Sequence, residues 1–284
     1  MIRKLFCWLC SLVMLSCKNN TSQLIIKGSD TEVNLMVLLA EAYWQQHPKW
    51  QVSVSGGGSG VGIVALLNGR ADIANSSRPM NAKEQALFQR YGVACDTFIF
   101  AEDAIAIIAH ATNPIDSLTV EQLQAIFSGQ LRNWQSLNGN HLKINLYGRP
   151  NNSGTHAWLQ KKLGISFCKH VLEMNGNAQI VEAIKLDQSG LGYVSAGYVV
   201  KNYQQTGEGF KILRIAAKGQ AACSPLDKEA VEQQKYYLLR PLYQYIRRES
   251  AQKAQPFIEF IKSPAGEEIL LANGYFLVRN DSAK

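Results

Sequence analysis

The sequence YGRPNNSGTH at residues 147–156 decides the fold of this chain. The segment before it, residues 142–146, alternates apolar and polar side chains and predicts a strand, whereas residues 157–163 have a helical pattern. A strand, a turn and a helix in this order place the end of the stretch at a helix N-terminus. There the first backbone N–H groups lack partners inside the helix, and the helix dipole favours negative charge. The stretch is therefore predicted to bind an anion.

The side chains of this stretch suit an oxyanion. Ser153 and Thr155 offer hydroxyl donors, and Gly154 lets a ligand approach the backbone N–H groups closely. Arg149 precedes them and adds a planar guanidinium that stays charged. The simpler alternative is an ordinary turn that only caps a helix, so a second half of the site is needed to decide.

Three earlier units of the chain repeat this design of strand, hydroxyl-rich turn and helix. Their turns cover residues 28–32, 55–60 and 75–80. In a doubly wound sheet such turns gather at the carboxyl ends of the strands, where ligands bind. We therefore expect a second anion-binding edge. Its hydroxyl-bearing side chains are Ser29, Thr31, Ser59 and Ser77.

Two long apolar segments, residues 98–109 and 236–245, are candidates for strands that cross between two lobes. Two crossings imply that the helices at the C-terminal end return to the first lobe. We therefore predict one lobe formed by residues 24–104 plus 238–284 and a second lobe formed by residues 105–237.

The N-terminal segment has the features of a targeting signal. Residues 1–16 combine a basic start with a short apolar run, which predicts a signal peptide. The sequence MLSC that ends at Cys17 resembles the lipobox of bacterial lipoproteins, although Met14 stands where Leu, Val or Ile is usual. We expect Cys17 to be lipidated and residues 17–23 to form a tether. A transmembrane anchor is the alternative, but the apolar run is too short to span a bilayer.

Cysteine usage predicts no disulfide framework. Of the six cysteines, Cys7 and Cys10 would leave with the signal peptide and Cys17 would carry lipid. The remaining three can form at most one disulfide. They are Cys95, Cys168 and Cys223.

Composition and charge favour a globular protein with an anionic ligand. The chain is 46% hydrophobic and 18% charged, which excludes disorder for most of its length. Its formal charge of +7 attracts anions at long range. The Lys and Arg residues are scattered, without the clustered stripe of a nucleic-acid binder, so a nucleic-acid partner is not expected.

Catalysis and cofactor binding have weak support in the sequence. Residues 60–65 fit a loose dinucleotide fingerprint, but the next strand's acid, Asp72, comes too soon to hold a ribose. Ser153 and His156 resemble a nucleophile and base, yet His156 is expected to cap its helix or lie on the exposed face. The histidines lack metal-ligand spacing. We therefore expect no enzyme activity, cofactor or metal.

Asp30 is an acid within an otherwise donor-rich anion site. A carboxylate can accept the proton of a monoprotonated phosphate, whereas fully ionised sulfate has no proton to give and would be repelled. Asp30 is thus a candidate selectivity filter. Alternatively, it caps the helix that begins near Glu32, and the two roles can coexist.

Together these segments resemble the phosphate-binding proteins of ABC transporters. The resemblance covers nearly the whole chain after the signal, in order. It rests on residues 28–31, 55–60, 71–80, 118–129, 133–134, 148–155, 190–194 and 263–266. It implies an α/β, two-lobed type II periplasmic-binding-protein fold, with mixed sheets flanked by helices and two crossover strands as the hinge.

The resemblance also implies the ligand contacts. In the first lobe they are Ser29, Asp30, Thr31, Ser59, Gly60, Ser77 and Arg78, and in the second lobe Arg149, Ser153, Gly154 and Thr155. Two positions depart from the best-known members, which have the proton-accepting Asp where this chain has Ser77 and often Thr where it has Asp30. The hypothesis is that the acid has moved across the pocket. Arg78 either faces the ligand as a second cation or bridges the lobes at the rim.

The sequence therefore predicts an extracytoplasmic, lipid-anchored binding protein that captures inorganic phosphate and delivers it to an ABC permease as a monomer. Within the same class, sulfate, molybdate or tungstate are alternative ligands. From other classes, a secreted phosphate-ester hydrolase and an anion sensor that docks on a membrane receptor remain alternatives.

Overall fold

The computed structural model describes residues 22–200 and 209–278. The predicted signal peptide, residues 1–16, and the candidate lipidation site Cys17 lie outside these residues. In the described part of the chain, no helix has the length and apolar character needed to cross a membrane.

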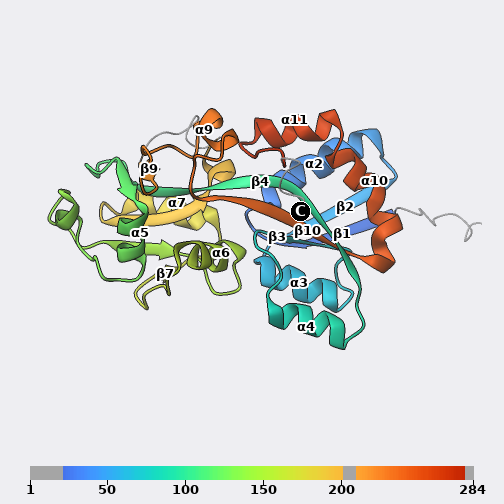
Figure 1. The fold of residues 1–284 in the computed structure, drawn as a ribbon. Coiled ribbons are helices and arrows are strands. Elements are labelled where there is room, and N and C mark those ends of the chain that lie inside the picture. Colours follow the sequence, from blue (N-terminus) through green and yellow to red (C-terminus); the bar gives the residue numbers. More distant parts are fainter. Residues whose placement is uncertain (1–21, 201–208, 279–284) are drawn as a thin grey trace, which may run out of the picture.

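The first part of the chain alternates strands and helices as predicted (Figure 1). Its elements are β1 (Ser22–Gly28), α2 (Val33–Gln46), β2 (Trp50–Ser55), α3 (Ser59–Leu67), β3 (Ile73–Ser76) and α4 (Ala82–Arg90). Strand β1 pairs in parallel with β2 on one side and with β3 on the other, so the three following loops lie at one edge of the sheet. The predicted convergence of these loops is confirmed.

Two boundaries in this part differ from the prediction. Strand β1 begins at Ser22, inside the predicted tether of residues 17–23, and Ser22 pairs with Trp50. The pattern of residues 70–74 predicts a third strand from Arg70 onward, but this strand begins at Ile73. The reason is that the Arg70 N–H donates to the Ala65 carbonyl and so still belongs to the end of α3.

Two long antiparallel strands connect the halves of the molecule, as the sequence predicted (Figure 1). They are β4 (Cys95–His110) and β10 (Leu239–Arg247). Strand β10 pairs with β3 and with the first part of β4. From Ile105 onward, β4 instead pairs with strands of the second half. One strand thus carries the sheet from one half into the other.

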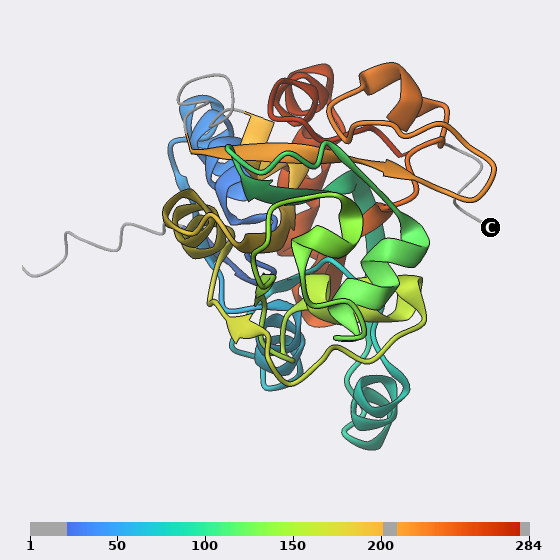
Figure 2. The ribbon, with the colours of Figure 1, turned by 90° about the vertical axis from the view of Figure 1, so that its left-hand side faces the viewer.

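The second half is also a mixed sheet with helices around it (Figure 2). Its elements are β5 (Ser117–Thr119), α5 (Val120–Phe127), β6 (Asn145–Gly148), α6 (Gly154–Leu163), β7 (Leu172–Glu173), α7 (Asn177–Leu186), β8 (Gly190–Ser195), β9 (Phe210–Ala216) and α9 (Lys228–Glu232), with a short 3-10 turn at Trp134–Leu137. Strand β4 pairs antiparallel with β8 and β9, and β8 continues in parallel to β6 and β7. The parallel strands β6 and β8 place the loop before α6 at their carboxyl edge.

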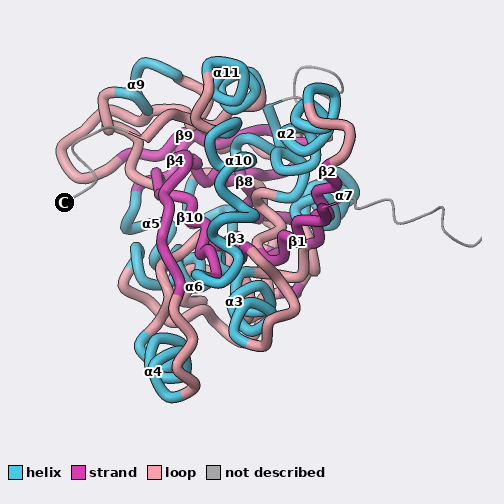
Figure 3. The backbone as a smooth tube through the Cα atoms, turned by 90° about the vertical axis from the view of Figure 1, so that its right-hand side faces the viewer, coloured by secondary structure: helices cyan, strands magenta, loops and turns pink. Residues whose placement is uncertain are grey.

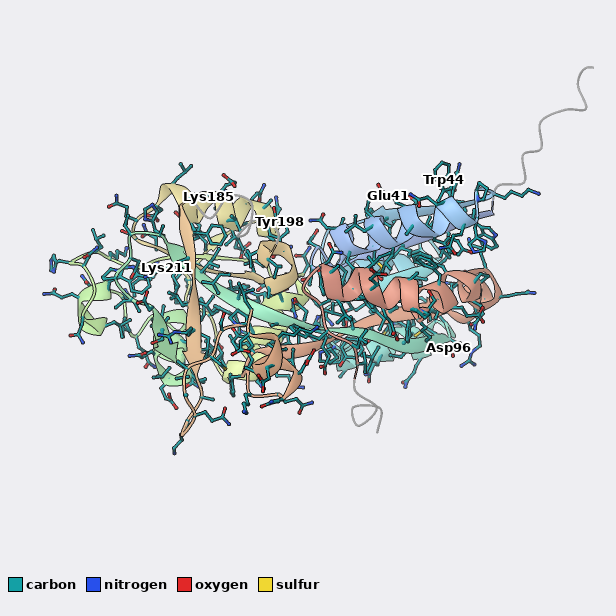
Figure 4. All side chains as sticks on the ribbon, turned by 90° about the horizontal axis from the view of Figure 1, so that it is seen from above. Glu41, Trp44, Asp96, Lys185, Tyr198 and Lys211 are labelled. Carbon is teal, nitrogen blue, oxygen red and sulfur yellow. The ribbon has the colours of Figure 1, made fainter. Side chains whose placement is uncertain are left out.

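The last two helices return to the first half, as expected from two crossings (Figure 3). They are α10 (Ala251–Ile261), which follows a 3-10 turn at Arg248–Ser250, and α11 (Pro264–Ala272). Both pack against α2, where the ring of Phe257 lies edge-on to that of Tyr43 at 5.3 Å. Viewed from above, Glu41 and Trp44 lie on the outer side of α2, while Lys185 and Lys211 belong to the other half (Figure 4).

The buried apolar side chains form two large clusters. One takes its residues from 104–238 with Phe276, and the other from 24–101 and 242–275. The mixed α/β, two-lobed fold class is therefore confirmed. The lobe boundaries at 104/105 and 237/238 stay a prediction, because the first lies inside β4 and the second directly before β10.

Candidate anion-binding site

Three serines from three different loops of the first lobe meet at the edge predicted from the sequence. Ser29 Oγ donates to Ser77 Oγ at 3.1 Å, and the hydroxyls of Ser59 and Ser77 lie 3.4 Å apart. The Ser77 N–H also donates to Ser59 Oγ at 3.1 Å. All three side chains are buried. They form a hydroxyl cluster, defined here as Ser29, Ser59 and Ser77.

The N-terminus of α6, from the second lobe, faces this hydroxyl cluster. Ser153 is the N-cap of α6, and its Oγ accepts a hydrogen bond from the His156 N–H. Gly154, the next residue, packs tightly against the hydroxyl cluster. A Cβ at this position would overlap Ser59 Oγ and lie 2.5 Å from Ser77 Oγ. Beside it, the hydroxyls of Thr155 and Thr31 are 3.2 Å apart. The two predicted halves of the anion site are thus brought together.

Arg149 is the cation of the site. Its side chain forms an ion pair with Asp30, and its Nη2 donates to the Asn175 carbonyl at 2.8 Å. Its backbone N–H donates to the Tyr193 hydroxyl at 2.9 Å, which fixes the turn after β6. The side chain is 3% exposed, and within the described residues its Nε has no hydrogen-bond partner. That buried N–H is suited to an oxyanion ligand.

Asp30 does not have the capping role that was weighed for it. Helix α2 has Glu32 at its N-cap position, and Asp30 points instead toward the second lobe. One of its oxygens accepts the Gly57 N–H at 2.9 Å, and the other faces Arg149. The carboxylate therefore lies beside the cation of the site, where a filter would have to be. Its filter role stays a prediction.

Two candidate contacts are engaged elsewhere. The guanidinium of Arg78 binds both oxygens of Glu84 at 2.7 Å each, so its role in the site stays a prediction. This ion pair secures the start of α4, where Glu84 also completes a capping box with Asn81. The Gly60 N–H donates to the Asn152 carbonyl at 3.1 Å, so it joins the lobes directly.

His156 is also placed differently from the expectation. It is buried rather than on the exposed face of α6, and its ring stacks on Phe167 with 4.5 Å between centroids. Burial lowers its pKa, which favours the neutral ring. Its Nδ1 lies 3.2 Å from the Tyr193 hydroxyl, which is the same hydroxyl that contacts the Arg149 backbone. His156 is therefore a packing residue and not a base for Ser153.

The structure adds a buried ion pair that the sequence interpretation missed. Arg240 on β10 and Asp103 on β4 are directly opposite each other in the strand register, and both are fully buried. Arg240 donates to Asp103 Oδ2 through Nε at 3.1 Å and through Nη2 at 2.8 Å. Burial raises the pKa of Asp103, and the Arg240 guanidinium opposes this effect. A charged pair inside two apolar crossing segments was the available signal.

Glu32 is the second buried acid that the sequence interpretation missed. It is fully buried behind Ser29, and among the described residues neither carboxyl oxygen has a hydrogen-bond partner. Burial raises its pKa well above the ordinary value, so the uncharged form is favoured.

Cys95, Cys168 and Cys223 are free thiols. Within residues 22–200 and 209–278, no group of three or more His, Cys, Asp or Glu side chains could hold a metal ion.

Comparisons with known proteins agree with this geometry. A family model described as the PBP superfamily domain matches residues 18–265. The phosphate-binding protein PstS of Pseudomonas aeruginosa is 30% identical over an alignment of 270 residues, and the match covers 87% of this chain and 80% of the relative. The PstS of Staphylococcus aureus strain USA300 is 26% identical over 241 residues, with 83% of this chain and 71% of the relative covered.

Solved structures share the fold. A phosphate ABC transporter substrate-binding protein from Clostridium perfringens, with bound phosphate, has a TM-score of 0.79 at 25% identity, covering 90% of this chain and all of that one. An ABC-type phosphate transport receptor from Vibrio cholerae has a TM-score of 0.69 at 29% identity, with the same coverage. The chain belongs to the PBP superfamily. The relatives named above are binding proteins, and both solved structures belong to ABC-type phosphate transport systems.

Proposed function

We propose that this protein captures inorganic phosphate between its two lobes and delivers it to the permease of an ABC transporter. The observation that carries the proposal is the meeting of two donor sets from opposite lobes. The N-terminus of α6, where the first backbone N–H groups have no partner within the helix ladder, faces the hydroxyl cluster of Ser29, Ser59 and Ser77. The names of the PstS relatives and the bound phosphate of the Clostridium perfringens protein support phosphate as the ligand.

The proposed contacts combine one cation with neutral donors. From the second lobe, Arg149 and the α6 N-terminus at Ser153, Gly154 and Thr155 bind the oxyanion. From the first lobe, Thr31 and the hydroxyl cluster complete the shell. The Arg78 side chain is left out, because Glu84 holds it, and Gly60 holds the two lobes together.

Selectivity is proposed to come from Asp30. The carboxylate lies beside Arg149, inside the first ligand-facing loop. A phosphate that keeps one proton can donate it to a carboxylate, whereas sulfate at neutral pH would meet uncompensated repulsion. The same reasoning makes molybdate and tungstate poor ligands when fully ionised. The acid thus discriminates by proton content rather than by size.

The proposed location and partners follow from the same role. A receptor that feeds a permease works outside the cytoplasmic membrane, and a lipidated Cys17 would hold it there. The short apolar run and MLSC sequence support this anchor. Capture by lobe closure needs one chain only, so we propose a monomer that docks on permease subunits.

Calorimetric titration of the domain from residue 22 onward tests the proposal. We expect phosphate to bind and sulfate to be rejected at the same concentration. An Arg149→Lys variant should lose most of the affinity, because Lys cannot provide the planar fork. Arg78→Lys is the matched control, since Arg78 is held by Glu84, and it should bind phosphate like the wild type. A domain that binds neither anion, or binds both equally, would contradict the proposal.

A further inference from the structure

Arg240 lies behind the proposed site, on a crossing strand, and touches two of its loops. Its Nη2 donates to Thr31 Oγ1 at 3.1 Å, and its Nη1 donates to the Ser77 carbonyl at 3.4 Å. The side chain is fully buried, so these contacts are shielded from solvent. One guanidinium therefore holds the first and the third loop of the first lobe together.

The contact with Thr31 determines which way its hydroxyl points. A threonine hydroxyl has one hydrogen and two lone pairs, and Arg240 can only donate. Because the guanidinium occupies a lone pair of Thr31, the hydroxyl hydrogen must point away from Arg240. The side of Thr31 Oγ1 that faces Thr155, at 3.2 Å, is the interface between the lobes. A hydrogen bond from a cation also polarises the hydroxyl and makes it a stronger donor.

The charge of Arg240 is balanced on the side away from the site. Asp103 accepts two hydrogen bonds from Arg240 and a third from Ser195 Oγ at 2.6 Å. Ser195 ends β8 of the second lobe, whereas Asp103 and Arg240 lie on the two crossing strands. A continuous buried chain therefore runs from the second lobe through both crossing strands to Thr31.

We propose that Arg240 is a positioning residue that fixes the Thr31 hydroxyl as a hydrogen-bond donor toward the bound oxyanion. This inference rests on the proposed function, because it assigns Thr31 to the ligand shell. Arg240 does not need to touch the ligand. It selects for a ligand oxygen that can accept a hydrogen bond at the Thr31 position, so the proton of a monoprotonated phosphate must lie elsewhere.

A double-mutant cycle with phosphate titration tests the proposal. Arg240→Lys keeps a cation next to Asp103, but the lysine side chain is one atom shorter and lacks the Nη2 group that contacts both Asp103 and Thr31. We expect it to weaken phosphate binding about 10-fold in the wild-type background, the size expected for one charge-assisted hydrogen bond. In a Thr31→Val background the same change should cost less than about 2-fold, because the hydroxyl that Arg240 positions is gone. Equal losses in both backgrounds, or no loss in either, would overturn the proposal.

Two further variants separate positioning from general damage. Arg247→Lys changes another arginine of β10, which contacts the Leu66 and Leu67 carbonyls, and should leave phosphate binding unchanged. If Arg240→Lys does not fold, the paired Arg240→Met and Asp103→Leu variant removes both charges together, and the same cycle applies. Wild-type phosphate binding is the separate test of the proposed function. If the wild type binds sulfate instead, the cycle is run with sulfate and still measures the coupling between Arg240 and Thr31 in anion binding.

Discussion

Asp30 of the first lobe and Arg149 of the second form an ion pair across the interface between the lobes. The acid is held in place by the Gly57 N–H, and the cation by the Asn175 carbonyl. Because the pair neutralises itself, the site offers an incoming anion one partly engaged cation and a shell of neutral donors. The affinity for the anion then depends more on the positions of the hydrogen-bond donors than on the net charge of the site.

Replacing Asp30 with Asn should reduce the preference for phosphate over sulfate more than it reduces the affinity for phosphate. The amide oxygen can still accept the Gly57 N–H, but the negative charge beside Arg149 is lost. We expect sulfate binding to become measurable, and the preference for phosphate over sulfate to fall by at least about 10-fold, which is about 1.4 kcal/mol. Competition titration with both anions measures the ratio.

The control for this variant is Asp116→Asn, because Asp116 forms an exposed ion pair with Lys211 in the second lobe. It should keep the wild-type preference. If Asp30→Asn still rejects sulfate as strongly as the wild type, the acid has no filtering role and serves only to join the lobes.

Sequence reasoning found the parts of the site that are built locally. A turn that follows a strand and begins a helix is determined by residues that are adjacent in the sequence. We could therefore predict the loops that carry Ser29, Ser59 and Ser77, and also the start of α6. The parallel direction of β1, β2 and β3 was predictable from the repeated strand–turn–helix units, but their order, with β1 between β2 and β3, was not predicted.

The partners of the charged side chains were not predictable in the same way. Asp30 and Arg149 are 119 residues apart, and Asp103 and Arg240 are 137 apart. Only the register of β4 with β10 places Asp103 and Arg240 opposite each other. Arg78 is different, since its partner Glu84 is only six residues away, yet the sequence analysis considered only the ligand and the lobe rim as its partners.

Replacing Gly154 with Ala should prevent the lobes from closing. A methyl group there would overlap Ser59 Oγ and lie 2.5 Å from Ser77 Oγ, both on the opposite lobe. Each lobe can fold without this contact, so we expect phosphate affinity to fall by more than about 100-fold while the unfolding temperature of the ligand-free protein changes little. Titration calorimetry and thermal unfolding measure the two effects.

Gly176→Ala is the matched control for this change. Gly176 is the N-cap of α7 in the same lobe, and an added Cβ there meets nothing within 4 Å. It should bind phosphate like the wild type. Equal affinity of Gly154→Ala and Gly176→Ala would show that the closed arrangement is not the binding arrangement.

Asn152 should contribute to closure without touching the ligand. Its amide Nδ2 donates to the Gly57 carbonyl at 3.1 Å, across the interface between the lobes. Asn152→Ala removes that bond, so we expect phosphate affinity to fall about 2- to 10-fold, the equivalent of one ordinary hydrogen bond. The loss should appear as faster dissociation in stopped-flow measurements. The exposed neighbour Asn151, changed to Ala, should have no effect, and a similar loss there would mean that the turn itself had been disturbed.

Glu32 should make stability depend on pH. Burial raises its pKa well above the ordinary 4.5. The Ser29 side chain and the Arg240 guanidinium only partly oppose this effect, and Asp103 adds to it. The folded protein therefore keeps a proton on Glu32 that the unfolded chain releases. That contribution to stability is complete below about pH 4.5 and is lost progressively as the pH rises toward the folded-state pKa, at up to about 1.4 kcal/mol per pH unit.

Replacing Glu32 with Gln removes this titration, because an amide does not ionise. We therefore expect the free energy of unfolding of Glu32→Gln, relative to the wild type, to increase between about pH 5 and about pH 8. Urea unfolding at several pH values measures the difference. Glu41→Gln is the control, since Glu41 lies on the outer side of the same helix (Figure 4), and its curve should stay parallel to the wild type. Parallel curves for Glu32→Gln as well would mean that the carboxyl is already ionised in the folded protein, with Arg240 as its counter-charge.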